Sequence, residues 1–263
     1  MHFTKYNGLG NDFIFLDGET ALSVKNPVSL ARTLCNRYTG IGADGLILLL
    51  PSQKADVRMR IINSDGSEAE MCGNASRCVP LHLLKEGFAS KKKITLETMA
   101  GLIYTEVLDE HKGLVQVNMG SPRDMATNFS VDLAGQVWTG TKVSMGNPHF
   151  VILVKNVEKF PVAEMGPLFE THPLFPQKTN VEFVQILDRT CVRMRVWERG
   201  AGITRACGTG ACATAVACIL QELTAQQVTV KLDGGELQIA WPEQKEIFMT
   251  GPAQKVFEGE ISL

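Results

Sequence analysis

Hydrophobic and polar residues alternate over short segments along most of this chain. In residues 57–62, valine, methionine and isoleucine alternate with two arginines, a period of two that predicts a strand with one buried face. Similar alternation, or a short continuous apolar run, predicts further strands at 13–16, 46–50, 94–98, 102–108, 149–154, 181–187, 191–197, 227–232, 236–240 and 246–250.

Three segments have helical spacing instead. Residues 28–37 place apolar side chains three and four residues apart. A second helix is predicted from residue 72 or 73 to about residue 86, with Gly87 as its stop. A third, over 208–223, is rich in alanine and cysteine and apolar on nearly all sides, which is typical of a buried helix.

The chain contains an internal repeat. VRMRIIN at 57–63 recurs as VRMRVWE at 192–198, an offset of 135 residues, and the same offset carries Cys72 onto Cys207. Each cysteine is followed by a glycine and small residues. Further matches keep the same order at nearly the same offset: 10–13 with 146–150, 94–103 with 228–237, and Gly120 with Gly251. Ancient duplication explains this better than chance; a duplicated scaffold without a shared site is the plain alternative.

The repeat predicts an α+β fold of two pseudo-symmetric domains, each a curved, mostly antiparallel sheet wrapped around a central helix. We expect the domains at 1–122 and 123–263, with the last residues returning to pack on the first half. Pro122 and several polar residues interrupt the pattern at Gly120–Asn128, where we place the junction.

Size and composition exclude several classes of function. The 263 residues suffice for two domains of about 130 residues, with 21% charged and 44% hydrophobic residues and a net charge of −2. This balance argues against a nucleic-acid or membrane-surface partner. The first residues lack the apolar core of a secretory signal, and the seven cysteines form no CxxC pair. We therefore expect a reduced, cytoplasmic protein.

The two repeated cysteines lie at predicted helix starts. The pKa of a free cysteine thiol is near 8.5, and a helix N-terminus can lower it to about 3.5–7.5. The free amides at such an end also bind anions. Two such ends could hold a carboxylate between two thiols, with amides from Gly73, Asn74, Gly208 and Thr209. The alternative is a pair of buried cysteines that merely cap helices. The cysteine spacings do not match the usual zinc pairs, so no metal site is expected.

The glycine-rich motifs resemble, over the full length, those of the diaminopimelate epimerase family; they lie at 7–13, 40–45, 63–74, 146–149, 180–183 and 198–211. The resemblance implies two domains facing a central cleft and Cys72 and Cys207 as the acid–base pair. It also implies an amino-acid substrate, no cofactor, a homodimer, and a place in lysine and peptidoglycan precursor synthesis.

The resemblance also implies roles for residues around the thiols. Glu198 would meet a substrate ammonium, Arg199 would clamp the distal carboxylate, and His149 and Glu198 would tune the pKa of the cysteines. The implied substrate-binding set is Asn11, Asn63, Gly73, Asn74, Asn147, Asn180, Glu198, Arg199, Gly208 and Thr209. Taken singly, the asparagines could be turn residues, Arg199 a surface charge and His149 a core histidine.

Several positions depart from the family pattern. Gly45 stands where some members carry glutamine, Ser76 lies where glycine and alanine are commoner, and Ile203 and Arg205 flank a threonine that usually follows glutamate. These departures motivate the hypothesis of an amino-acid racemase of relaxed specificity, for example on an acidic amino acid. A non-catalytic amino-acid-binding protein is the second alternative.

Overall fold

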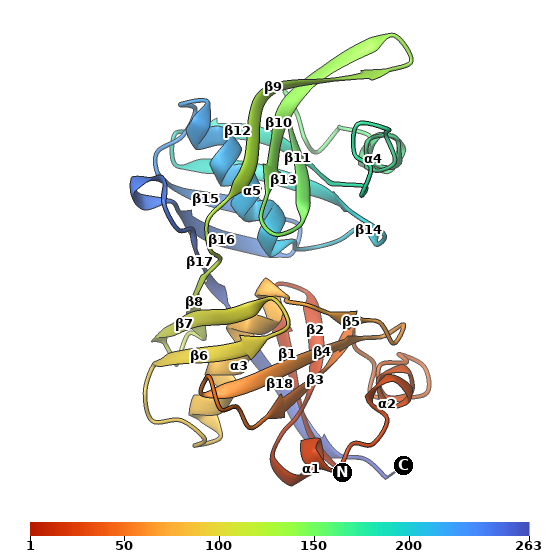
Figure 1. Ribbon diagram of the computed structural model, residues 1–263, viewed down its shortest axis with the longest axis vertical. Helices are drawn as coiled ribbons and strands as arrows, with labels where there is room; N and C mark the ends of the chain where they lie inside the picture. Colours follow the sequence, from red (N-terminus) through yellow and green to blue (C-terminus); the bar gives the residue numbers. More distant parts are fainter. Residues whose placement is uncertain (263) are drawn as a thin grey trace. The chain divides into compact units, whose positions relative to one another are not determined.

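The computed structural model describes residues 1–262. It divides into two compact units (Figure 1). Unit 1 is Met1–Val117 together with the chain from Gly251 onward, and unit 2 is Asn118–Thr250. The first boundary lies a few residues before the expected one at 122, and the C-terminal strand belongs to unit 1.

Unit 1 is a mixed sheet with three helices. Its strands pair in the order β18 (Gln254–Glu260), β1 (His2–Gly8), β2 (Asn11–Leu16), β3 (Gly45–Leu50), β4 (Val57–Asn63), β6 (Lys93–Thr98), β7 (Gly101–Asp109) and β8 (Leu114–Asn118). The short β5 (Glu68–Ala69) also pairs with β4. The pairs β2–β3 and β4–β6 are parallel, and the others are antiparallel. The helices are α1 (Gly18–Leu22), α2 (Pro27–Leu34) and α3 (Gly73–Lys85).

Unit 2 repeats this order strand by strand. Its strands are β9 (Arg123–Leu133), β10 (Gln136–Ser144), β11 (Pro148–Leu153), β12 (Asn180–Asp188), β13 (Cys191–Glu198), β15 (Gln227–Leu232), β16 (Gly235–Ala240) and β17 (Phe248–Pro252), with β14 (Gly202–Ile203) on β13. The parallel pairs, β11–β12 and β13–β15, are those that the repeat requires. Its helices are α4 (Val162–Glu170), α5 (Gly208–Leu220) and the short η1 (Pro242–Gln244). The predicted duplication and the α+β fold class are therefore confirmed.

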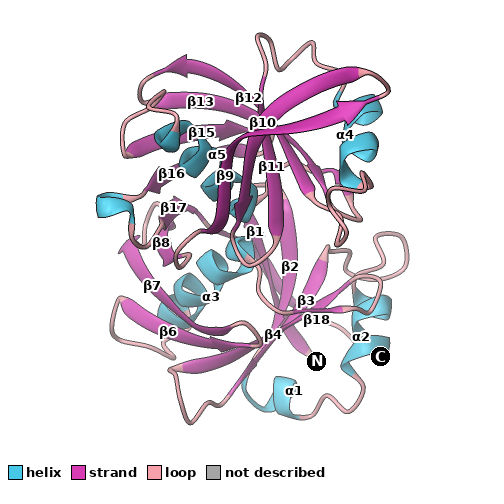
Figure 2. Cartoon of the chain, turned by 45° about the horizontal axis from the view of Figure 1, so that its top comes forward, coloured by secondary structure: helices cyan, strands magenta, loops and turns pink. Residues whose placement is uncertain are grey.

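Each unit encloses one helix. Helix α3 packs against β1, β6, β7 and β18, and residues 73–83 are all buried. Helix α5 packs against β10, β11, β12, β13, β15 and β16 (Figure 2), and Thr209 alone is not buried between Gly208 and Ile219. The prediction of a buried alanine-rich helix is correct.

A second apolar layer explains why some strands are apolar throughout. In β3, Ile47 and Leu49 belong to the core around α3, whereas Leu46 and Leu48 belong to a separate core with Leu34 of α2. A strand covered on both faces reads as a continuous apolar run rather than as an alternation. Within the described chain, no helix is long and apolar enough to cross a membrane.

The pattern missed the helices α1 and α4, the strands β1, β8, β9, β10 and β18, and the short elements β5, β14 and η1. Strand β1 carries a buried lysine, Lys5, between Phe3 and Asn7 on one of its faces. Strand β9 is mostly exposed and polar, so the irregular junction expected at Gly120–Asn128 is wrong from Arg123 onward. Helix α4 contains Pro167, which reads as a helix breaker. The stop after α3 is correct, since Gly87 adopts a positive φ of 74° there.

The raised pKa values of the buried thiols predict that the protein loses stability at alkaline pH. Burial raises the pKa of Cys35 to about 11, and that of Cys78 and Cys218 to about 12. An unfolded chain ionises these thiols from about pH 8.5, while the folded chain keeps its protons. The unfolded state then binds fewer protons, so the thiol contribution is fully present below about pH 8.5 and is lost as the pH rises to 11–12.

We expect Cys78→Ala to flatten the fall of the unfolding free energy between about pH 9 and 11. One thiol accounts for up to about 1.4 kcal/mol per pH unit. Denaturant melts at several pH values, under reducing conditions, measure the slope. Val79→Ala, a truncation in the same buried helix, should keep the wild-type slope. Equal slopes in all three proteins would contradict the prediction.

Candidate active site

Cys72 is the N-cap of α3. Its backbone is extended, with φ −139° and ψ 117°, and its carbonyl accepts the Ser76 amide and hydroxyl, both at 2.9 Å. The thiol lies 3.7 Å from Asn11 Oδ1, and Asn74 Nδ2 donates to the same oxygen at 3.1 Å. The structure thus brings together the side chains of Asn11, Cys72 and Asn74.

A network of charges fixes the direction of the Asn11 amide. Asn11 Nδ2 donates to Asp44 Oδ2 at 2.7 Å, and Asp44 also accepts from Arg37 at 2.8 Å. Because an ionised carboxylate only accepts, the amide oxygen of Asn11 must point the other way, toward Cys72. Arg37 and the buried Lys5 both bind Asp12. Burial opposes ionisation of Asp12, but the hydrogen bonds from Arg37 and Lys5 lower its pKa to about 2.

A buried guanidinium supports the first turn of α3. Arg77 donates to the Gly73 carbonyl at 3.3 Å, to Asn74 Oδ1 at 3.0 Å and to the Pro252 carbonyl at 3.2 Å.

Asn63 lies at the end of β4, where its side chain donates to Ser67 Oγ at 3.0 Å. This contact of Asn63 belongs to a turn, which is the plain interpretation of its role.

Cys207 is the N-cap of α5, the position that Cys72 has in α3. Its sulfur accepts the Gly210 amide at 3.3 Å and lies 3.6 Å from Thr209 Oγ1. The residue is only 5% exposed. Burial first, and then the negative charges of Glu198 and Glu182, raise the pKa of this thiol well above its usual value. Burial and these charges therefore favour the protonated form of the Cys207 thiol.

Glu198 ends β13 beside this thiol. Its carboxyl accepts a hydrogen bond from Thr204 Oγ1, and its charge raises the pKa of the Cys207 thiol. Burial raises the pKa of Glu198, while the bond from Thr204 and the nearby His149 lower it. The carboxyl thus faces the cysteine that it is expected to tune.

His149 is joined to the same site through a residue that the sequence did not single out. Its Nδ1 lies 2.7 Å from Glu182 Oε1, and both side chains are fully buried. Its Nε2 lies 3.0 Å from Asn147 Oδ1, and Asn147 Nδ2 donates to Thr209 Oγ1 at 3.3 Å. A signal for Glu182 existed: it is a charged residue inside a predicted apolar strand.

Asn180 and Arg199 form a second cluster in unit 2. Asn180 donates to the Pro148 carbonyl at 2.8 Å and accepts the Arg199 amide at 3.0 Å. The exposed Arg199 side chain donates to the Gln177 carbonyl at 3.1 Å. Gly208 is the buried first residue of α5.

The departures from the family pattern include both exposed and buried positions. Ile203 and Arg205 are exposed, whereas Thr204 between them binds Glu198. Gly45 is buried in β3, and a Cβ there would lie 3.2 Å from the Ile62 carbonyl oxygen. Ser76 is buried and bonds the Cys72 carbonyl. The charge change at 203 and 205 therefore acts on exposed positions rather than on the groups around Cys207.

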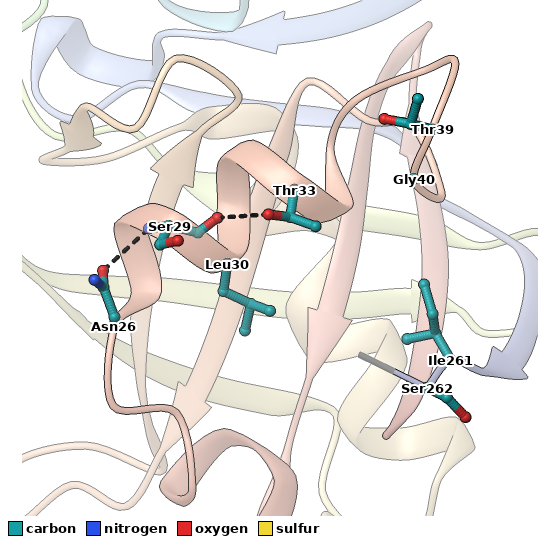
Figure 3. A pocket seen from close by; sticks show the side chains of 8 residues that line it. All are labelled: Asn26, Ser29, Leu30, Thr33, Thr39, Gly40, Ile261 and Ser262. Carbon is teal, nitrogen blue, oxygen red and sulfur yellow. Dashed lines mark hydrogen bonds between the residues drawn. The ribbon is translucent and has the colours of Figure 1, made fainter.

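A groove beside α2 in unit 1 contains none of the predicted site residues (Figure 3). It is lined by Asn26, Ser29, Leu30, Thr33, Thr39, Gly40, Ile261 and Ser262. Asn26 Oδ1 accepts the Ser29 amide, and Thr33 Oγ1 donates to the Ser29 carbonyl. Over residues 1–262, no three histidine, cysteine or acidic side chains are grouped to hold a metal ion.

Comparisons with known proteins agree with this picture. The model of the diaminopimelate epimerase family matches residues 3–125 and 141–256. A diaminopimelate epimerase of Pelotomaculum thermopropionicum is 50% identical over 275 residues, covering 99% of this chain and 98% of the relative. One from Methanococcus maripaludis is 47% identical over 278 residues, covering 100% of both.

Two solved structures share the fold at low identity. A phenazine biosynthesis protein of the PhzF family from Bacillus anthracis has a TM-score of 0.77 at 16% identity, covering 100% of this chain and 99% of the other. A probable proline racemase from Agrobacterium radiobacter has a TM-score of 0.73 at 18% identity, covering 100% and 93%. On the strength of the full-length sequence matches, this chain belongs to the diaminopimelate epimerase family.

Proposed function

We propose that this chain interconverts LL- and meso-diaminopimelate without a cofactor, with Cys72 and Cys207 as its acid–base pair. Relatives of that name at about half identity over the full length support the reaction and the substrate. One observation carries the choice of residues. Each repeat places a single cysteine as the N-cap of its enclosed helix.

The proposed chemistry is a proton transfer at the α-carbon. One cysteine, as its thiolate, removes the α-proton, and the other delivers a proton to the opposite face; the roles exchange in the reverse direction. The α-proton is very weakly acidic, so the charge that gathers on the α-carboxylate must be stabilised. The backbone amides in the first turns of α3 and α5 can supply this, because the helices fix them before the reaction begins.

The two thiols are not equivalent at rest. Cys207 is buried and lies beside two carboxylates, Glu182 and Glu198, which raise its pKa. The residues at the equivalent positions in unit 1 are uncharged, Ile47 and Asn63. We therefore assign the first proton donor to Cys207. The same raised pKa makes its thiolate a stronger base when the reaction runs in reverse.

The remaining contacts follow the chemistry of the substrate. Glu198 and the asparagines Asn11, Asn63, Asn147 and Asn180 would hold its polar groups, since an amide both donates and accepts. Arg199 would bind the distal carboxylate; its side chain is exposed and bonds a single backbone carbonyl. A homodimer and the supply of lysine and peptidoglycan precursors stay predictions from the family resemblance, and a cytoplasmic location stays a prediction from the sequence.

We expect Cys72→Ser and Cys207→Ser each to lose epimerisation by about 10²-fold or more, because a serine hydroxyl is a far weaker acid and base. The measurement is deuterium incorporation at the α-carbon from heavy water. Cys191→Ser, at the partly exposed start of β13, is the matched control and should keep wild-type exchange. Wild-type protein that binds diaminopimelate without exchange would instead indicate a non-catalytic binding protein.

Two thiols that act on one carbon can also join. We expect mild oxidation to produce a Cys72–Cys207 disulfide, with a parallel loss of activity that a thiol reductant restores. Peptide mapping by mass spectrometry identifies the crosslink. A crosslinked population that retains full activity would contradict the two-thiol mechanism.

Arg199→Met should raise KM for diaminopimelate by about 10- to 100-fold, because a charge-assisted hydrogen bond is worth about 1.5–3 kcal/mol. Arg189→Met, which removes another exposed arginine of unit 2, should leave KM unchanged.

The same assay on single enantiomers of glutamate and alanine tests relaxed specificity. Wild-type turnover of glutamate at a rate similar to that of diaminopimelate would favour the racemase suggested by Gly45, Ile203 and Arg205.

A further inference from the structure

Glu182 is a fully buried carboxylate in the middle of an apolar strand. It lies between Val181 and Phe183 in β12. Its Oε1 accepts from His149 Nδ1 at 2.7 Å, and its Oε2 has no hydrogen-bond partner among residues 1–262. Burial of a carboxylate with one oxygen unsatisfied is unfavourable, so a reason other than stability is needed.

The repeat supplies an internal comparison for this pair. In unit 2, His149 pairs with Asn180 across β11 and β12, and Glu182 follows two residues later on β12. In unit 1, Phe13 pairs with Gly45 across β2 and β3, and Ile47 follows two residues later on β3. His149 and Glu182 therefore occupy the places of Phe13 and Ile47.

The unit 1 pair is an ordinary part of the core. Phe13 is 2% exposed, Ile47 is fully buried, and both belong to the apolar cluster around α3. The same arrangement of strands is thus stable with an aromatic and an aliphatic side chain at these two places. Replacement of a buried ion pair by apolar residues of similar size is often neutral or stabilising. The fold does not need the polar pair of unit 2.

A third position differs in step with these two. Gly210, in the first turn of α5, has Ala75 as its counterpart in α3, at the offset of 135 residues. A Cβ on Gly210 would lie 2.7 Å from Glu182 Oε1 and 3.1 Å from Cys207 Sγ. Glycine at this position leaves room for the carboxylate beside the helix end that carries the thiol.

A continuous set of contacts links Glu182 to that thiol. His149 Nε2 lies 3.0 Å from Asn147 Oδ1, Asn147 Nδ2 donates to Thr209 Oγ1 at 3.3 Å, and that hydroxyl lies 3.6 Å from Cys207 Sγ. Because the carboxylate oxygen of Glu182 and the amide oxygen of Asn147 both only accept, both ring nitrogens of His149 must donate for these contacts to be hydrogen bonds, and the two acceptors together fix the ring.

We infer that Glu182 is a positioning residue for the proposed reaction: its buried carboxylate holds the His149 ring, and through it the Asn147–Thr209 contacts at Cys207. The inference rests on the proposed function. It assigns Glu182 no contact with the substrate. It adds to the site one charged group, the Glu182 carboxylate of β12, which acts on the acid–base residue Cys207.

The charge of Glu182 also bears on the titration of Cys207. The groups that face this thiol are Glu182 from β12, Glu198 from β13, and Thr209 with the Gly210 amide from α5, while His149 from β11 faces the two carboxyls. Burial and the two carboxylates raise the pKa of Cys207. Removal of the Glu182 charge should therefore lower that pKa.

The test is Glu182→Gln in the full chain. Glutamine can still accept from His149 Nδ1 but lacks the charge. We expect kcat to fall by about 10-fold or more, as for other carboxylates that orient a functional histidine, with KM within a few-fold of wild type. The Cys207 thiolate should also form at lower pH than in the wild type. It is measured by titrating the ultraviolet absorbance of thiolates with pH; the Cys207 contribution is the difference between proteins with and without the Cys207→Ser substitution. Glu158→Gln, an exposed carboxylate bound to Arg193, is the control and should change neither quantity.

A second pair of variants separates function from folding. Glu182→Ile leaves His149 buried without its acceptor and should lower the melting temperature. Adding His149→Phe recreates the pair that unit 1 uses and should restore the melting temperature but not the activity.

Wild-type kcat and an unshifted Cys207 titration in folded Glu182→Gln would overturn the inference. So would recovery of activity in the phenylalanine–isoleucine double variant. If the wild-type protein shows no α-proton exchange, the proposed function fails instead. The Cys207 titration still reports on Glu182 in that case.

Discussion

The chemistry of this protein depends on where its two enclosed helices begin. A helix buried on all sides must have its first amides satisfied or directed at a ligand, and α3 and α5 both start at a cysteine with an extended backbone. The surrounding sheet holds that end rigidly, because residues throughout both helices are buried. A thiol at such an end gains fixed amide donors beside it, which is the condition that proton transfer without a cofactor requires.

Duplication produced the same scaffold twice, and the two copies then diverged around their thiols. In unit 1, Asn11 is oriented by Asp44, and an uncharged amide oxygen faces Cys72. In unit 2, the charges of Glu198 and Glu182 act on Cys207 and raise its pKa. An acid and a base that exchange roles need comparable strengths, but a defined resting state needs one of them to keep its proton. Unequal neighbours on equal scaffolds meet both needs.

Much of this was readable from the sequence. The repeat at an offset of 135 residues, the strand periods and the two helix starts predicted the fold and the two cysteines. The polar contacts were less accessible, because they depend on the pairing of distant strands. Glu182 could be recognised only once β12 was placed beside β11, and Asp44 only once it met Asn11. Strand β18 was missed because its partner, β1, lies at the other end of the chain.

The energetics of the buried polar pair explain why the comparison between repeats is informative. Each replacement in unit 2 is unfavourable when taken alone: a carboxylate for Ile47, an imidazole for Phe13, and a glycine for Ala75 in the first turn of the helix. Chance drift toward three adjacent unfavourable residues is improbable in a protein of marginal stability. The three residues compensate one another, since the glycine makes room for the carboxylate and the carboxylate holds the imidazole. What they gain jointly is a fixed charge beside Cys207, so the explanation for all three lies at the thiol.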